Sequence, residues 1–186
     1  ELDEYTYSVA GCVGEFWTHM SVDHQFDTNE ELRKELFEKG IKFGKALQLI
    51  NILRDIPEDI LMGRCYIPED ELLRYNLIPG DLLDSKNMNE FRSLYDSYIS
   101  KTYDYLKEAI VYVGLLPNNE YRLRLSCLLP ILIGQRTLIM LTENNVLDAG
   151  NRIKVSRKDI KKIFRRALFA SLSRNKSLKL LRKNMI

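Results

Sequence analysis

The chain has 186 residues, of which 45% are hydrophobic and 29% are charged, with a formal net charge of +2. This composition excludes a disordered chain, and the length suits one domain or a large part of one. The 3 cysteines have no CxxC spacing, which argues against a disulfide framework and favours reduced thiols in the cytoplasm.

The first predicted helix, over residues 2–20, contains a run of small residues. It reads YTYSVAGCVGEF from Tyr5 to Phe16. A glycine inside a helix costs about 0.8 to 1 kcal/mol relative to alanine, so Gly11 and Gly14 imply close approach of another helix or of a bulky ligand. The residues leave both explanations open, and Tyr5 also suits an ordinary core tyrosine with a bonded hydroxyl.

The second predicted helix, over residues 29–59, carries the clearest chemical signal. Four polar residues share one helix face because they follow at spacings of three, four and four: Gln48, Asn51, Asp55 and Asp59. The other positions of residues 46–60 are mostly apolar, so this part of the helix should be buried. Buried carboxylates need compensation, and carboxylate and amide oxygens suit a hard divalent cation. The pattern therefore predicts Mg²⁺ bridging to a phosphate.

Pro57 should kink or loosen this helix, because it has no backbone N–H and disfavours helix for the residue before it. The kink would re-aim Asp59. Arg64 and Tyr66 follow within the segment GRCYIPEDEL, where a guanidinium and a phenol can engage a metal-bound anion. The alternative for Arg64 is a surface ion pair with Glu58 or Asp70.

Further helices are predicted where apolar residues recur at helical spacing: residues 69–75, 87–113, 119–144 and 156–173. Strand signals are weak, so the pattern predicts an all-α bundle. The longest apolar region, over residues 123–141, is interrupted by arginine, proline and glutamine. It therefore indicates a core helix rather than a membrane span.

Residues 151–186 are strongly basic, with thirteen Lys and Arg against the single Asp159. Within them, residues 160–172 carry apolar and basic residues on opposite faces of a predicted helix. Three interpretations are open: a terminal helix docked on the core with a solvated basic face, attachment to an anionic membrane surface, and nucleic-acid binding. No recognised module or aromatic platform accompanies the charge, so we expect no nucleic-acid partner.

Three segments together resemble the squalene and phytoene synthase family, the head-to-head prenyl synthases: YTYSVAGCVG at 5–14, LQLINILRDIPED at 47–59 and GRCYIPEDEL at 63–72. The resemblance implies an all-α, isoprenoid-synthase-type helical bundle. It also implies a Mg²⁺-dependent prenyltransferase that joins two farnesyl or geranylgeranyl diphosphates through C1. In the family a cyclopropyl diphosphate intermediate then rearranges to squalene, dehydrosqualene or phytoene, and the squalene-forming members use NADPH.

The resemblance also implies roles for single residues near the diphosphate. Three residues of the second aspartate-rich motif match ligands of the Mg²⁺ that carries a substrate diphosphate: Asn51, Asp55 and Asp59. Gln48 matches a residue that lines the same cavity. Arg64 and Tyr66 match positions close to the diphosphate.

Other matches concern the prenyl chains and the reductant. Tyr5 matches a tyrosine implicated in proton handling. The wall along which the prenyl chains lie is matched by Val9, Ala10 and Gly11. Lys154 and Arg157 loosely resemble a basic stretch near the nicotinamide-nucleotide site, although a solvated basic loop explains them equally well.

The family carries a first aspartate-rich motif on an earlier helix, and nothing upstream of Tyr5 in this chain matches it. We therefore expect residues 1–186 to be the C-terminal portion of a single squalene/phytoene synthase domain, with the N-terminal helices missing and the missing segment as a partner. The isolated chain should then be inactive. The alternatives are a non-catalytic or regulatory derivative of the family, or another Mg²⁺-dependent isoprenoid enzyme. We expect a cytoplasmic location, with peripheral membrane contact through the basic region.

Overall fold

The computed structural model describes residues 1–183, and among these residues the regular elements are helices without any strand. This confirms the predicted all-α class. The α-helices are α1 (Leu2–Thr6), α2 (Cys12–His24), α3 (Glu30–Arg54), α4 (Ile56–Leu61), α5 (Glu69–Leu73), α6 (Met88–Leu115), α7 (Tyr121–Glu143), α8 (Arg157–Ser171) and α9 (Arg174–Lys183). A π-helical turn, η1 (Tyr7–Gly11), joins α1 to α2, and two 3₁₀ turns, η2 (Pro79–Leu83) and η3 (Ser85–Asn87), precede α6.

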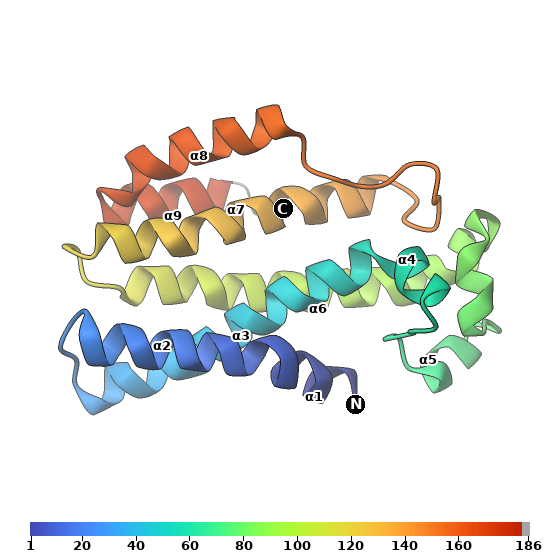
Figure 1. Ribbon diagram of the computed structural model, residues 1–186, viewed down its shortest axis with the longest axis horizontal. Coiled ribbons are helices and arrows are strands. Elements are labelled where there is room, and N and C mark those ends of the chain that lie inside the picture. The colour runs from blue at the N-terminus through green and yellow to red at the C-terminus, as the bar shows by residue number, and fades with distance from the viewer. Residues whose placement is uncertain (184–186) are drawn as a thin grey trace.

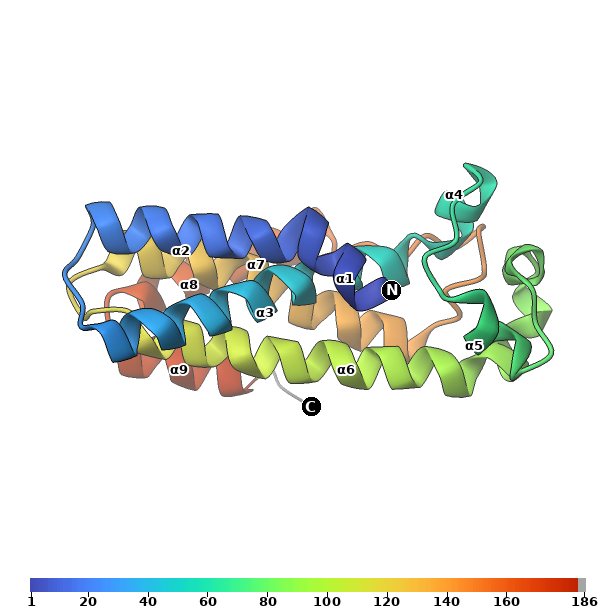
Figure 2. The ribbon, with the colours of Figure 1, turned by 90° about the horizontal axis from the view of Figure 1, so that it is seen from below.

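The long helices lie side by side in an elongated bundle (Figures 1 and 2). α3 is the central helix, because it packs against α2, α6 and α7. α8 and α9 cover the side of the bundle opposite α2 (Figure 1). α4, α5 and the 3₁₀ turns gather at the end of the bundle where the N-terminus lies (Figure 2). The irregular segments that can carry a site are therefore concentrated at this end.

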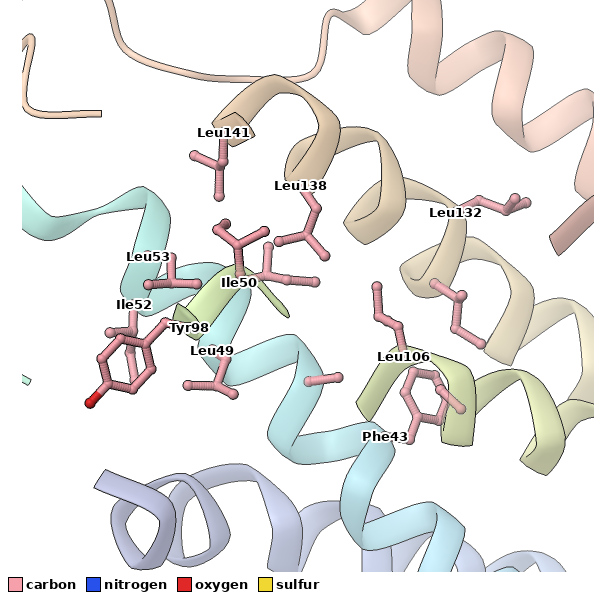
Figure 3. Close-up of a cluster of buried hydrophobic side chains, with 14 of the residues drawn as sticks. Phe43, Leu49, Ile50, Ile52, Leu53, Tyr98, Leu106, Leu132, Leu138 and Leu141 are labelled. Atoms are coloured by element: carbon pink, nitrogen blue, oxygen red, sulfur yellow. The ribbon is translucent and has the colours of Figure 1, made fainter. Parts of the chain in front are cut away.

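The core forms where α3, α6 and α7 meet. Figure 3 shows Ile50 and Leu53 of α3 facing Leu138 and Leu141 of α7, with Leu106 contributed by α6. Each of these side chains is less than 5% exposed. Burial of such apolar surface is the main favourable term in folding. The apolar sides of α3 are thus used in the core, and its polar side remains for a ligand.

Close helix packing explains the small residues of the first segment. A Cβ at Gly14 would lie 2.0 Å from the carbonyl oxygen of Gly40, and a Cβ at Gly44 would lie 2.1 Å from the carbonyl oxygen of Ala10. Only glycine permits such an approach of backbone to backbone. Of the two explanations for Gly14, the close approach of another helix is therefore the one seen.

The interruption of the second predicted helix falls earlier than expected. α3 ends at Arg54, Asp55 has φ −104° and ψ 19°, and α4 begins at Ile56. Pro57 lies in the first turn of α4, where backbone N–H groups have no acceptor within the helix. Its missing N–H therefore costs α4 no hydrogen bond. The kink predicted at Pro57 is thus a break at Asp55.

A polar cluster anchors α1 to the rest of the bundle. The Asp3 carboxylate accepts hydrogen bonds from Lys45 Nζ of α3 and from the Tyr105 hydroxyl of α6, each at 2.6 Å. Burial opposes ionisation, but these hydrogen bonds outweigh it and lower the pKa of Asp3 to about 2. This cluster fixes the position of α1, and with it Tyr5.

α7 is the one helix in the described part of the chain that is long and apolar enough to cross a membrane, with a mean hydropathy of 1.6 over its most apolar window. Half of that window is buried. Because α7 packs against α3, α6 and α8, these properties suit the core helix that the sequence predicts. α8 docks on α7 and α9, with Ala167 and Ala170 buried, so the amphipathic helix predicted over residues 156–173 does lie on the core, although α9 follows it in the chain.

Candidate active site

The predicted polar line lies at the C-terminal end of α3 and continues onto α4. The N–H of Asp59 donates to the carbonyl oxygen of Asp55 at 2.9 Å, so one helical turn separates the two aspartates. Gln48, Asp55 and Asp59 are half-buried, and Asn51 is exposed. The helix is buried on its apolar sides as expected, while the polar line itself lies at an open edge that a ligand can reach.

Basic side chains that sequence reasoning missed surround Asp55. Arg54 Nε donates to Asp55 Oδ1 at 2.8 Å, and its Nη2 donates to Oδ2. Arg152, from the loop between α7 and α8, places Nη2 3.7 Å from Asp55 Oδ1 and Nε 3.2 Å from Glu58 Oε1. Arg54 could have been recognised as a site residue because it is next to Asp55 in the sequence. For Arg152, the only sequence feature that points to the site is the basic stretch at 152–157.

Asp59 has a different environment from Asp55. Burial raises the pKa of Asp59, and the negative charge of Asp55 raises it further, against the opposing effect of Arg64. Among residues 1–183, the Asp59 side chain has no ion pair or hydrogen bond. A half-buried carboxylate that is close to a second one and makes no contact ion pair is a favourable position for a bound cation.

The donor set fits Mg²⁺ that is shared with a phosphate. In the described part of the chain, no three His, Cys, Asp or Glu side chains come close enough to hold a metal on their own. The oxygen donors present are the Asn51 amide and the carboxylates of Asp55 and Asp59. Mg²⁺ is commonly held by one or two carboxylates together with substrate phosphates and waters, so this set suffices for part of such a site.

A tight turn brings Arg64 back toward Asp59. Gly63 has a φ of +75°, and the N–H of Arg64 donates to the carbonyl oxygen of Asp59 at 2.9 Å, as in a Schellman cap. The Arg64 side chain is exposed, and its charge acts on Asp59 by lowering that carboxyl's pKa. Neither alternative ion pair of Arg64 is seen among the described residues, where Glu58 pairs with Arg152 and Asp70 with Arg74.

Two tyrosines stack beside the carboxylates. The rings of Tyr5 in α1 and Tyr66 in the α4–α5 loop have centroids 4.8 Å apart and an interplanar angle of 28°. A hydrogen bond with Tyr66 raises the pKa of Tyr5, and burial and the charge of Asp59 add to this effect. Tyr5 is thus protonated at neutral pH, and its phenol needs a change in the surrounding charge before it can act as a base.

An apolar groove of about 400 Å³ runs between η1, α2, α3 and α7 and borders the polar line. Its lining residues are Val9, Ala10, Val13, Gly14, Trp17, Phe43, Gly44, Leu47, Gln48, Asn51, Ser126, Cys127 and Pro130. Val9 and Ala10 therefore line an apolar groove that borders the polar line. Gly11 does not line the groove, since a Cβ there would meet Lys45 Cγ at 3.3 Å and Ile41 Cγ2 at 3.4 Å on α3.

The bundle has the all-α isoprenoid-synthase fold. A structure of TcSQS in complex with the ligand BPH1237 superposes with a TM-score of 0.82 at 20% identity, covering 99% of this chain and 53% of that one. A dehydrosqualene synthase in complex with a ligand superposes with a TM-score of 0.71 at 23% identity, covering 89% of this chain and 55% of that one.

Sequence comparison identifies the family of this chain within the isoprenoid-synthase fold class. The model of the squalene/phytoene synthase family matches residues 1–159, so the chain belongs to that family of prenyltransferases. It is 38% identical over 113 residues to the 15-cis-phytoene synthase of Synechocystis sp., covering 59% of this chain and 34% of that protein. It is 34% identical over 110 residues to a chloroplastic phytoene synthase of an Oncidium hybrid cultivar, covering 59% of this chain and 26% of that protein.

These matches confirm the family inferred from the three motifs. The matched region is 34% of the length of the Synechocystis relative and 53% of the TcSQS chain. The chain therefore spans about a third of that curated relative and about half of the solved structure.

Proposed function

We propose that this protein catalyses the head-to-head (1′–1) condensation of two prenyl diphosphates, farnesyl or geranylgeranyl, to squalene, dehydrosqualene or phytoene. The observation that carries the proposal is the continuity of the apolar groove with the polar line, since Gln48 and Asn51 belong to both. A prenyl diphosphate has the same division into a long apolar chain and a charged head. The prenyltransferase family supports this reaction class.

In the proposed reaction, Asn51, Asp55 and Asp59 would hold Mg²⁺, and that ion would stabilise the charge of the departing diphosphate. Arg64 is free to donate to the same diphosphate. Val9 and Ala10 line the groove and exclude water from the allylic cation. The two substrates join through a cyclopropyl diphosphate intermediate.

Tyr5 is our proposed group for removing or relaying the proton at ring closure. Its pKa is raised partly by the charge of Asp59, so any positive charge gained beside Asp59 favours the phenolate. Tyr66 holds the ring by stacking and can share the proton. This role connects the carboxylates to the proton transfer through charge rather than through direct contact.

We also propose that further carboxylates, from a segment outside residues 1–186, complete the metal site. The support is that no three carboxylates in the described part of the chain come close enough to hold a metal, and that arginines already pair with Asp55 and Glu58. The isolated chain should then bind prenyl diphosphate poorly and fail to turn it over. Product formation by residues 1–186 alone would contradict this proposal.

The direct test is incubation of the full-length protein with farnesyl or geranylgeranyl diphosphate and Mg²⁺, with and without NADPH, followed by mass spectrometry of the extracted products. A hydrocarbon with twice the carbon number of the substrate is expected. Squalene formed only with NADPH would support a nucleotide site near the exposed Lys154 and Arg157. A cyclised product of one substrate would favour a cyclase instead, and no product would favour a non-catalytic derivative.

A second proposal concerns location: we propose a cytoplasmic protein that contacts an anionic membrane surface through α8. Four apolar residues of α8 and its C-cap residue are exposed although the helix is docked on the core: Ile160, Phe164, Leu168, Phe169 and Leu172. Phe169 and Leu172 are 71% and 65% exposed. Exposed lysines and arginines flank this row, as in helices that lie in a membrane interface.

Vesicle co-sedimentation tests this contact. Binding of the full-length protein to vesicles with anionic lipid should exceed binding to neutral vesicles. The double variant Phe164→Ser, Phe169→Ser should bind the anionic vesicles about tenfold more weakly, because it removes two aromatic rings that would be buried in the membrane interface. The control is Phe16→Ser, which removes an aromatic ring of 64% exposure from α2. Equal binding by all variants would contradict the proposal.

A further inference from the structure

The break between α3 and α4 leaves one backbone carbonyl without its usual donor. Pro57 has no N–H, so the carbonyl oxygen of Leu53, four residues earlier, cannot accept the hydrogen bond that continues an α-helix. Leu53 is 0% exposed. A buried carbonyl of this kind needs a partner other than bulk water, because buried backbone groups are almost always paired.

Tyr95 of α6 supplies that partner. Its hydroxyl donates to the carbonyl oxygen of Leu53 at 3.2 Å, between residues 42 apart in sequence. Tyr95 is 0% exposed, and its ring packs on Phe91 with centroids 5.5 Å apart. Burial raises the pKa of Tyr95, so the hydroxyl keeps its proton and acts as a donor.

The position of this bond matters for the site. The accepted carbonyl lies two residues before Asp55, where α3 ends, and Asp59 follows in α4 after the non-helical backbone of Asp55. The angle between the two helices decides how the Asp55 and Asp59 carboxylates are presented to one cation. Without the Tyr95 donor, the Leu53 carbonyl would turn toward another partner and the break would lose its fixed geometry.

We propose that Tyr95 is a positioning residue: by occupying the Leu53 carbonyl, it holds the break that sets Asp55 and Asp59 at the geometry used for Mg²⁺. The effect on Mg²⁺ rests on the proposed function, whereas the hold on the break does not. Groups that orient metal ligands from behind commonly change metal affinity by 10–100-fold when they are removed.

Two matched variants on α6 isolate the hydroxyl. Tyr95→Phe removes one oxygen atom and keeps the ring. Tyr112→Phe makes the same change at a residue that is 1% exposed, whose hydroxyl instead accepts from Thr18 Oγ1 at 3.3 Å, away from the break. The two variants thus share the chemistry of the change and differ in its place.

The first readout is hydrogen exchange of residues 55–62 in the ligand-free, full-length protein. Exchange should be about tenfold faster in Tyr95→Phe and unchanged in Tyr112→Phe, because only the former frees the break. The second readout is the Mg²⁺ concentration that gives half-maximal turnover of farnesyl or geranylgeranyl diphosphate. It should rise by about tenfold in Tyr95→Phe and stay within about twofold in Tyr112→Phe.

A third variant separates positioning from simple stabilisation. Pro57→Ala in the Tyr95→Phe background restores an N–H that can bond to the Leu53 carbonyl. Exchange protection should then return, while the Mg²⁺ requirement should stay raised because a straighter helix replaces the break. Recovery of both readouts would overturn the positioning role and leave only stabilisation.

The remaining outcomes also decide the matter. Unchanged exchange in Tyr95→Phe would overturn the hold on the break. Faster exchange with an unchanged Mg²⁺ requirement would overturn the link to the carboxylates. Absence of any Mg²⁺-dependent turnover in the wild-type protein would instead refute the proposed function, and the exchange readout would still decide whether Tyr95 holds the break.

Discussion

Replacing Gly44 with alanine tests the close packing of η1 on α3, which shapes the groove. A Cβ at position 44 would lie 2.1 Å from the Ala10 carbonyl oxygen and 2.7 Å from its carbonyl carbon. Both atoms belong to the backbone and cannot rotate away as a side chain can. The two elements would have to separate by about 1 Å to restore ordinary contact.

The expected loss of stability follows from two opposing effects. Overpacking costs about 1–3 kcal/mol, and the upper end applies because a whole helical segment must move. Alanine returns about 0.8–1 kcal/mol through its higher helix propensity. The net loss is about 2 kcal/mol, which for a protein of this size lowers the Tm by about 4–8 °C.

Thermal unfolding of the full-length protein, followed by circular dichroism, measures this difference. The matched control is Gly114→Ala in α6, where a Cβ would meet only the Leu178 methyl groups at 3.4 and 3.6 Å. Gly114→Ala should melt at the wild-type temperature or slightly above it, since it gains propensity without a clash. A Gly44→Ala variant that melts as high as the control would refute the packing argument.

Three further predictions concern the site and its support. Asp55→Asn or Asp59→Asn should lower turnover at saturating Mg²⁺ by at least about 10²-fold with the fold kept, and near wild-type turnover would remove that residue from the metal site. Ala10→Leu should fill the groove and lower turnover of the longest accepted substrate by about tenfold at an unchanged Tm, whereas Gly11→Leu should mainly lower the Tm by intruding on α3; equal effects in both assays would contradict this. Asp3→Asn should lower the urea midpoint at pH 7, and the gap to wild type should close between about pH 4 and pH 2, because a lowered pKa gives stability that is lost as pH falls through it; a constant gap would show that the Asp3 charge is not responsible.

Residues on one continuous helix were predictable from spacing alone. Gln48, Asn51 and Asp55 keep their shared face because α3 runs unbroken to Arg54. Asp59 joins them because α4 resumes one residue after the break. The stacking of Tyr5 on Tyr66 was not predicted, since no local pattern links residue 5 to residue 66.

Features that depend on distant segments were not predictable. The break falls at Asp55 rather than at Pro57. The Leu53 carbonyl beside the break accepts a hydrogen bond from Tyr95, which lies on another helix. Arg152 reaches Asp55 only because of the path of the loop after α7. Gly11 faces α3 rather than the groove, which the average helical period cannot show because η1 departs from that period.

The π-helical turn η1 also sets the rotation of α1 relative to α2 about their common axis. A π turn carries one residue more than an α-helix spanning the same bonds, so it rotates everything upstream relative to everything downstream. Removing one residue from Tyr7–Gly11 would turn α1 by about 100° about its axis. Tyr5 would then leave Tyr66 and Asp3 would leave Lys45, although none of these four residues had been changed. The number of residues between Tyr5 and the groove wall is therefore as much a part of the site as their identity.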